Sequence, residues 1–139
     1  DIEVVQNDAA VFNPNWAEKF DAVLCDVPCS GTGVLGSRTD IFRNKTDESV
    51  NGLTDLQYKI IQTSSKYVKK GGRLVYSTCS LLKRENGGIM DKFLENNAGF
   101  KSVKPDINVK ALELDDYLQL TPSVSDTEGF FIAKAERLG

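Results

Sequence analysis

The sequence contains no histidine and only three cysteines among its 139 residues. The three thiols, Cys25, Cys29 and Cys79, are an odd number, and no two of them form a Cys-x-x-Cys pair. An odd count fits no secreted disulfide framework, and a chain without histidine or such a pair lacks the usual ligands of zinc. We therefore expect reduced thiols in a cytoplasmic protein, and no metal.

Long apolar runs and a basic excess are also missing. No apolar stretch reaches the roughly 18 residues that a membrane-spanning helix requires, so we expect no contact with a membrane. Acidic residues outnumber basic ones by 20 to 17, which gives a net charge of −3. A domain that binds RNA unaided normally presents a basic face, so the composition argues against a self-sufficient nucleic-acid binder.

The chain starts without an initiator methionine, a charged leader or a cleavage site for one. Asp1 is followed at once by the strand-like run Ile2–Val5, which suggests that preceding residues have been cut away. The length and a hydrophobic share of 40% predict that residues 1–139 form a single domain with a modest core.

Apolar runs and helical spacing alternate along the sequence. The run at 22–25 is continuous, which is typical of a parallel strand covered on both faces. Thr54 can cap a first helix, and Gly71-Gly72 is expected to end it. The expected strands are 2–5, 20–26, 73–78, 100–103 and 129–135, the expected helices are 54–70 and 84–97, and 28–52 and 105–127 are expected to be irregular. This order predicts an α/β doubly wound fold with a mostly parallel sheet flanked by helices.

Two chemically interesting segments, 26–33 and 77–80, follow predicted strands directly. Ligands of doubly wound sheets bind outside the carboxyl ends of the strands. We therefore expect Cys29 and Cys79 to lie at one edge of the sheet with their sulfurs close together. Cys25 lies inside an apolar run and is expected to be a buried, inert residue.

Together, the segments Asp26-Val-Pro-Cys-Ser-Gly-Thr-Gly and Tyr76-Ser-Thr-Cys-Ser resemble the paired signatures of the Sun (Fmu) family of RNA 5-methylcytosine methyltransferases. Either segment alone is a weak signal, but the two at this separation are very specific. The resemblance runs from about Val4 to the C-terminus. Further matches are Leu56-Gln57, Gly71-Gly72, Glu85-Asn86 and Gly129-Phe130-Phe131.

The resemblance implies a partial Rossmann-like class I methyltransferase fold that lacks its first strands, with S-adenosylmethionine as cofactor and RNA, ribosomal more than transfer RNA, as substrate. Carbon 5 of cytosine is too weak a nucleophile to attack a methyl sulfonium, and a thiolate added to carbon 6 activates it. By resemblance, Cys79 is that nucleophile, and Cys29 assists breakdown of the covalent adduct.

Three more residues match positions with family roles. The resemblance implies that Asp8 contacts the adenine of the cofactor. It also implies that Asp26 bonds either the amino edge and ring nitrogen of cytosine or groups of the cofactor, and that Pro28 belongs to the cofactor site. From the residues alone, Asp26 is equally a loop cap and Asp8 an ordinary turn residue.

The family's Gly-rich cofactor loop is expected upstream of residue 1, and Gly31-Thr32-Gly33 does not replace it because it opens no obvious helix. We therefore expect the fragment alone to bind the cofactor poorly and to be inactive. We also expect it to self-associate through the open edge of the strand at 22–26.

The segment 36–43 departs from the family pattern. Gly36 and Ser37 replace basic residues there, Thr39 replaces proline, and Phe42-Arg43 replaces Lys-Trp. These differences bear on RNA affinity or substrate choice more than on the reaction. Arg38 and Arg43 remain candidate phosphate contacts.

Two alternatives stay open. One is a class I methyltransferase acting on nitrogen through an Asp-Pro-Pro-Tyr-like segment, although Cys29 and Ser30 stand where that segment needs proline and an aromatic residue. The other is a non-catalytic RNA-binding or assembly module, which the acidic balance permits.

DNA cytosine-5 methyltransferases use the cysteine of their Pro-Cys segment as the nucleophile. The second thiol, Cys79, is what favours the RNA family over them.

Overall fold

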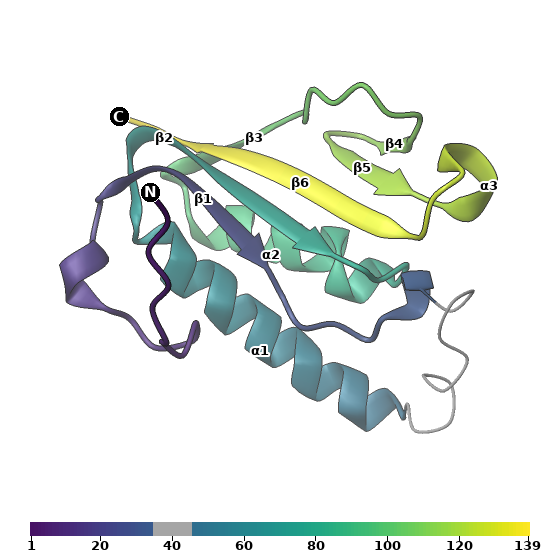
Figure 1. The fold of residues 1–139 in the computed structure, drawn as a ribbon, viewed down its shortest axis with the longest axis horizontal. Coiled ribbons are helices and arrows are strands. Elements are labelled where there is room, and N and C mark those ends of the chain that lie inside the picture. The colour runs from purple at the N-terminus through teal and green to yellow at the C-terminus, as the bar shows by residue number, and fades with distance from the viewer. Residues whose placement is uncertain (35–45) are drawn as a thin grey trace.

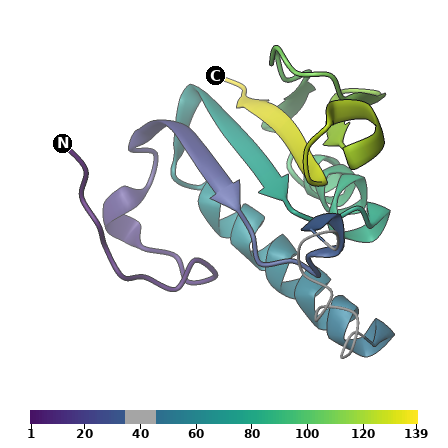
Figure 2. The same cartoon turned by 45° about the vertical axis from the view of Figure 1, so that its right-hand side comes forward.

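The computed structural model describes residues 1–34 and 46–139 (Figure 1). They form a six-stranded sheet in which the path β1-β2-β6-β5-β4 is joined by β3, which pairs with β6. Both long helices cover the same face of this sheet (Figures 1 and 2). The strands are β1 (Phe20–Asp26), β2 (Val68–Thr78), β3 (Phe100–Val103), β4 (Leu112–Leu114), β5 (Tyr117–Leu120) and β6 (Phe130–Arg137). The α-helices are α1 (Asp47–Ser65), α2 (Gly87–Asn96) and α3 (Pro122–Ser125).

The α/β fold with helices flanking a sheet is confirmed, but the sheet is mixed rather than mostly parallel. Among the described strands only β1 and β2 pair in parallel, and the other pairs are antiparallel. A parallel pair needs a long crossover, which α1 provides between β1 and β2, whereas β4 and β5 are joined by a tight hairpin.

The hairpin β4–β5 and the short α3 lie in 105–127, where we expected irregular structure. Asp115, with φ 55°, forms the turn between the two strands. Conversely, residues 2–5 were wrongly expected to form a strand. Ile2 and Val4 are more than 90% exposed, and no described strand pairs with this segment. An apolar run becomes a strand only when a neighbour supplies hydrogen bonds and cover.

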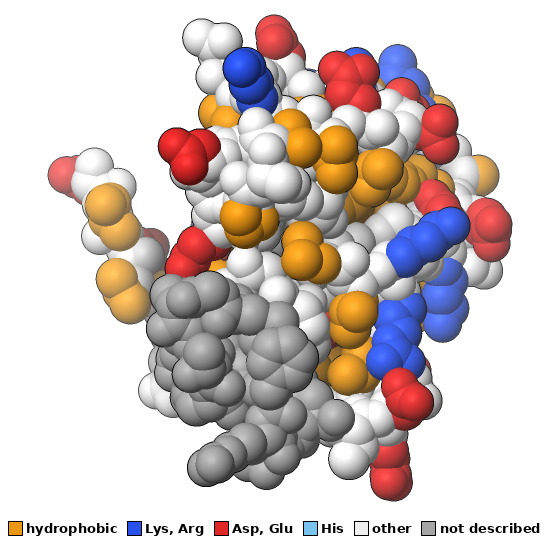
Figure 3. Space-filling view, turned by 90° about the vertical axis from the view of Figure 1, so that its right-hand side faces the viewer, with side chains coloured by type: hydrophobic (Ala, Val, Ile, Leu, Met, Phe, Trp, Pro, Cys, Tyr) orange, Lys and Arg blue, Asp and Glu red, His pale blue; other side chains and the backbone are white. Residues whose placement is uncertain are grey.

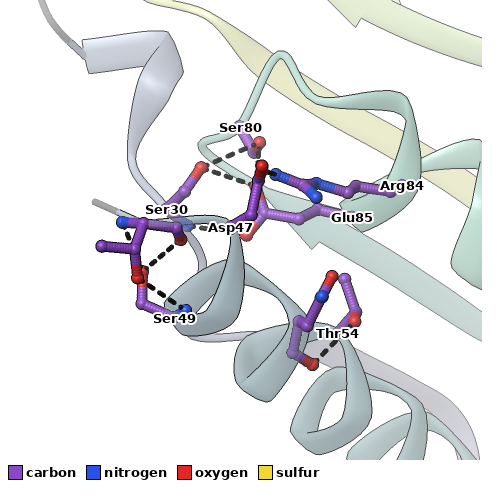
Figure 4. Close-up of polar contacts among 9 residues, drawn as sticks. Ser30, Asp47, Ser49, Thr54, Ser80, Arg84 and Glu85 are labelled. Atoms are coloured by element: carbon purple, nitrogen blue, oxygen red, sulfur yellow. Dashed lines mark hydrogen bonds and ion pairs between the residues drawn. The ribbon is translucent and has the colours of Figure 1, made fainter.

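Helix α1 begins seven residues before the position that we expected. Thr46 is its N-cap, accepts a hydrogen bond from the Ser49 amide at 3.2 Å and completes a reciprocal capping box with the Ser49 hydroxyl. Thr54 lies inside the helix, where its hydroxyl donates to the Asn51 carbonyl at 2.9 Å (Figure 4). Helix α2 likewise starts at Gly87 rather than 84, because a 3₁₀ turn precedes it.

The glycine pair Gly71-Gly72 does not end α1, which finishes at Ser65, but lies inside β2. The β1 register advances from Phe20 to Ala22 while its partner advances from Val68 to Arg73, so β2 bulges there. Gly71 has φ 76°, and a Cβ on Gly72 would lie 2.8 Å from the Asp21 carbonyl oxygen. The bulge therefore requires both glycines.

The core lies between the sheet and the two long helices. Its largest fully buried side chains include Tyr76 on β2, Phe131 on β6 and Phe93 on α2, and the Tyr76 and Phe131 rings meet edge to face at 6.3 Å. The phenol of Tyr76 donates to the Glu85 carbonyl at 2.6 Å, so the core is tied directly to the segment that follows β2.

Strand β1 is covered on one face only, contrary to the prediction from its apolar run. Cys25 is 3% exposed and faces the helices, whereas its neighbour Leu24 is 69% exposed. A surface hollow of about 600 Å³ lies beside this strand and is lined in part by Val5, Trp16 and Leu24. No helix of the described residues is long and apolar enough to cross a membrane.

Candidate active site

The carboxyl ends of β1 and β2 bring the two cysteine segments together. Asp26 pairs with Ser77 at the end of the parallel ladder, and the Val27 amide donates to the Ser77 carbonyl at 3.2 Å. Cys29 and Cys79 follow and are both half-buried, and their sulfurs lie 2.9 Å apart as free thiols. The predicted proximity of the two sulfurs at one edge of the sheet is confirmed.

Two glycines hold the backbones of these segments in contact. The Gly33 amide donates to the Cys79 carbonyl at 2.9 Å, and the Gly129 amide donates to the Gly33 carbonyl at 2.7 Å. A Cβ on Gly33 would lie 2.3 Å from the Gly129 oxygen and 2.8 Å from the Cys79 oxygen. Only glycine permits this approach of three backbones.

Glu85 joins the same two segments through side chains. It is 0% exposed, and both of its carboxylate oxygens accept hydrogen bonds. The donors include the Ser30 amide at 2.8 Å, the Ser30 hydroxyl at 2.6 Å and the Ser80 hydroxyl (Figure 4). Ser30 follows Cys29 and Ser80 follows Cys79, so the carboxylate bridges the residues next to both thiols.

Asn86 bonds the residues on either side of Cys79. Its amide oxygen accepts from the Thr78 hydroxyl at 2.6 Å, and its amide nitrogen donates to the Ser80 carbonyl at 2.8 Å. From the sequence, Glu85-Asn86 was only a matching pair, and neither residue was predicted to belong to the site. Their local sequence, Lys-Arg-Glu-Asn, is typical of an exposed turn and gives no sign of burial.

Asp26 is an exposed residue at the same edge, and the Ser77 hydroxyl donates to its carboxylate at 2.8 Å. Pro28 is exposed next to it. Asp8 is exposed and accepts a hydrogen bond from the Ala10 amide at 2.9 Å, so the contact it makes here is within its own turn. The structure does not place Arg38 and Arg43, which lie outside the described residues.

Apolar side chains are open to solvent at the end of the molecule seen in Figure 3, with charged side chains around them. Leu81, two residues beyond Cys79, is 44% exposed, and its amide donates to the Thr32 hydroxyl at 2.9 Å. The Cys79 segment thus presents an apolar side chain to solvent while its backbone is held by the Cys29 segment.

The pKa of the Cys29 thiol is raised to about 12, first by burial and then by its hydrogen bond with Cys79. Burial also raises the pKa of Cys25 to about 11, as expected for an inert thiol. Cys29 therefore keeps its proton at neutral pH and can act as a hydrogen-bond donor to the neighbouring sulfur.

Alkylation of Cys29 by iodoacetamide at pH 8 is expected to be at least about tenfold slower in the folded protein than in urea, because only the thiolate reacts. The folded rate should keep rising with pH beyond 9, toward the raised pKa. Peptide mass spectrometry over pH 7 to 11 measures this. A rate that levels off near pH 9 would show a sheltered thiol with an ordinary pKa.

Residues 1–136 match the family model of the 16S rRNA methyltransferase RsmB/F. The chain is 36% identical to ribosomal RNA small subunit methyltransferase F of Erwinia tasmaniensis over 136 residues, which cover 94% of this chain and 28% of that protein. It therefore spans less than a third of that relative's length.

Solved structures share the fold. The crystal structure of PH0851 has a TM-score of 0.82 and 31% identity, over 87% of this chain and 27% of that one. NSun6 from Pyrococcus horikoshii, solved with SFG, has a TM-score of 0.78 and 26% identity, over 99% of this chain and 35% of that one.

Proposed function

Since the chain belongs to the RsmB/F family of 16S rRNA methyltransferases, we propose that it is the C-terminal part of a catalytic domain that methylates carbon 5 of cytosine in RNA, with ribosomal RNA as the substrate. The resemblance to the Sun (Fmu) family is thereby confirmed. The observation that carries the proposed reaction is the pair of thiols 2.9 Å apart at the carboxyl ends of β1 and β2.

In the proposed reaction, the Cys79 thiolate forms a bond to carbon 6 of cytosine, and the displaced ring electrons make carbon 5 nucleophilic. After carbon 5 has taken the methyl group, a base removes its hydrogen. The ring electrons then restore the double bond, and the bond between carbon 6 and sulfur breaks.

Cys29 is suited to the last stage. Its raised pKa keeps it a thiol, and its sulfur lies within hydrogen-bond distance of Cys79. A proton donor beside the departing sulfur stabilises the negative charge that this sulfur regains. We therefore assign Cys79 as the nucleophile and Cys29 as the residue that assists its elimination.

Asp26 is proposed to face the substrate or the cofactor. Its carboxylate is oriented by the Ser77 hydroxyl at the strand end, in the same edge as the thiols. A carboxylate can accept a hydrogen bond from the exocyclic amino group of cytosine, and a protonated one can donate to the ring nitrogen. Arg38 and Arg43 stay proposals as phosphate contacts.

Methyltransferases of this family use S-adenosylmethionine, and SFG in the NSun6 structure is an analogue of it. When bound, this cofactor supplies an electrophilic methyl group. The exposed Asp26 and Pro28, at the end of a strand that is open on one face, fit one wall of such a site. Asp8, which accepts a hydrogen bond from the Ala10 amide, stays a proposal as the contact to the adenine.

The test is a transfer assay with full-length protein, ribosomal RNA and cofactor carrying a labelled methyl group, followed by mass spectrometry of the nucleosides. We expect the label in 5-methylcytidine. Label in a nitrogen-methylated nucleoside would favour the alternative of a class I methyltransferase acting on nitrogen. RNA binding without any transfer would favour the non-catalytic module.

The 139-residue chain by itself is expected to have no useful affinity for the cofactor and no turnover. We propose that the rest of the cofactor site lies outside residues 1–139, because the nucleotide of a doubly wound sheet binds across the switch point on a Gly-rich turn. The exposed Leu24 and the open edge of β1 should also lead the chain to self-associate.

Calorimetric titration with S-adenosylmethionine and light scattering of the purified chain measure both expectations. Micromolar cofactor binding by a clean monomer would contradict them. Leu24→Lys is the matched variant, because a lysine on the open strand should lower the association without changing the buried face.

A further inference from the structure

Glu85 is a fully buried carboxylate. None of the ion pairs among residues 1–34 and 46–139 includes it. Within these residues its hydrogen-bond donors are neutral: the Ser30 amide and hydroxyl, the Ser80 hydroxyl and the Gln57 amide at 3.1 Å. Burying a charge is costly unless hydrogen bonds satisfy it, so this position does more than fill space.

The donors come from three segments, and each of them is bonded to this carboxylate. Ser30 lies next to Cys29 and Ser80 next to Cys79, and their hydroxyl oxygens are 3.3 Å apart. Gln57, on α1, also donates to the Pro28 carbonyl at 2.9 Å, just before Cys29. The geometry thus connects the helix, the Cys29 segment and the Cys79 segment through one side chain.

We propose that Glu85 is a positioning residue that sets the distance between the sulfurs of Cys29 and Cys79, a role that rests on the proposed function for its purpose. It accepts hydrogen bonds from Ser30 and Ser80, the residues that follow the two thiols, and it forms no hydrogen bond with either described sulfur. Its effect on the reaction passes through the placement of the two sulfurs.

Each of the two oxygens of the Glu85 carboxylate accepts from two donors here. Glu85→Gln keeps the volume but replaces one carboxylate oxygen by an NH₂ group. The Ser30 and Ser80 hydroxyls would have to turn and accept from that group, and an amide holds them less tightly than a carboxylate does. The hold on the two cysteine segments is then loosened. Asp47→Asn is the matched control, because it neutralises an exposed carboxylate that pairs with Arg84, the residue next to Glu85, at 2.9 Å (Figure 4).

The first readout needs neither RNA nor cofactor. In full-length protein, the azo oxidant diamide removes one hydrogen from each of two adjacent thiols, forms a disulfide and is itself reduced to the hydrazine. We expect the Cys29–Cys79 disulfide to form at least about tenfold more slowly in Glu85→Gln than in wild type, and within twofold of wild type in Asp47→Asn. Single-thiol alkylation rates correct for changes in exposure.

If Glu85→Gln does not fold, the double variant Ser30→Ala with Ser80→Ala keeps the carboxylate and removes the two hydroxyl links to it, together with the bonds of these hydroxyls to Thr32 and the Leu82 amide. In this double variant the Cys29–Cys79 disulfide is expected to form about fivefold more slowly, while the circular dichroism spectrum stays native. A wild-type rate of disulfide formation in a folded variant of either kind would overturn the positioning role.

The second readout is methyl transfer by the full-length protein. Glu85→Gln should lower kcat at least about a hundredfold and leave the KM for RNA within about threefold, since the sulfurs act after the RNA has bound. If wild type makes no 5-methylcytidine, the proposed function fails while the disulfide rates still decide the positioning role. If wild type methylates and Glu85→Gln matches it in both readouts, the positioning role fails alone.

Discussion

Replacing Cys79 by alanine in the full-length protein is expected to lower methyl transfer at least about 10⁴-fold, which corresponds to about 5 kcal/mol of transition-state stabilisation. Without a sulfur to add to carbon 6, carbon 5 stays unreactive, and Cys29 cannot substitute because its proton is held by a raised pKa. The rate of label incorporation into RNA under single-turnover conditions measures the loss.

Cys25→Ala is the control for this variant. Cys25 lies in β1, is 3% exposed and faces the core rather than the strand ends, so its removal should cost stability but leave the transfer rate within a few fold. Transfer by Cys79→Ala at more than a tenth of the wild-type rate would contradict the role assigned to its sulfur.

Gly33→Ala is expected to destabilise the protein by about 3 kcal/mol, at the upper end of the cost of overpacking. The new methyl group would meet the backbone oxygens of Gly129 and Cys79 at 2.3 and 2.8 Å, and backbone cannot move aside as a flexible side chain can. The hydrogen bonds that join the three segments would break, so the thiols should separate as well.

Gly52→Ala is the matched substitution. Gly52 is exposed on α1, and a Cβ added to it would have no other atom within 4 Å, so alanine should stabilise the helix by about 0.5–1 kcal/mol. The stabilities of the two full-length variants are compared by their urea unfolding midpoints, measured at the same protein concentration. Equal midpoints for the two alanine variants would refute the close packing at Gly33.

The pairing of the two thiols could be predicted from the sequence because it follows from a general property of parallel strands. Once 20–26 and 73–78 are recognised as neighbouring parallel strands, residues just beyond them must share an edge. The shared edge places Cys29 and Cys79 near each other, and the predicted proximity holds although most of the sheet is antiparallel.

The burial of Glu85 could not be predicted in that way. A glutamate after Lys83 and Arg84 has the local sequence of a solvated turn, and only the meeting of β1, β2 and α1 encloses it. Tertiary contacts decide such positions, and local composition is uninformative about them.

The predicted ends of the first helix were wrong for a related reason. Thr46 and Thr54 are both acceptable caps by residue type, and Gly71-Gly72 suits a helix end as well as a bulge. The choice is made by the capping box at Thr46 and by the Asp21 backbone that packs against Gly72. Neither contact leaves a signal in the hydrophobic periodicity of the sequence.

The most direct test of the proposed covalent mechanism is to look for the adduct itself. Full-length Cys29→Ala is incubated with RNA and S-adenosylmethionine, resolved on a denaturing gel and digested, and the peptide that carries the nucleotide is identified by mass spectrometry. The two-thiol mechanism predicts an RNA-linked band with the methylated cytosine on Cys79, because addition survives and elimination fails. Normal methyl transfer by this variant without any adduct, or an adduct on Cys29 in the Cys79→Ala protein, would contradict it.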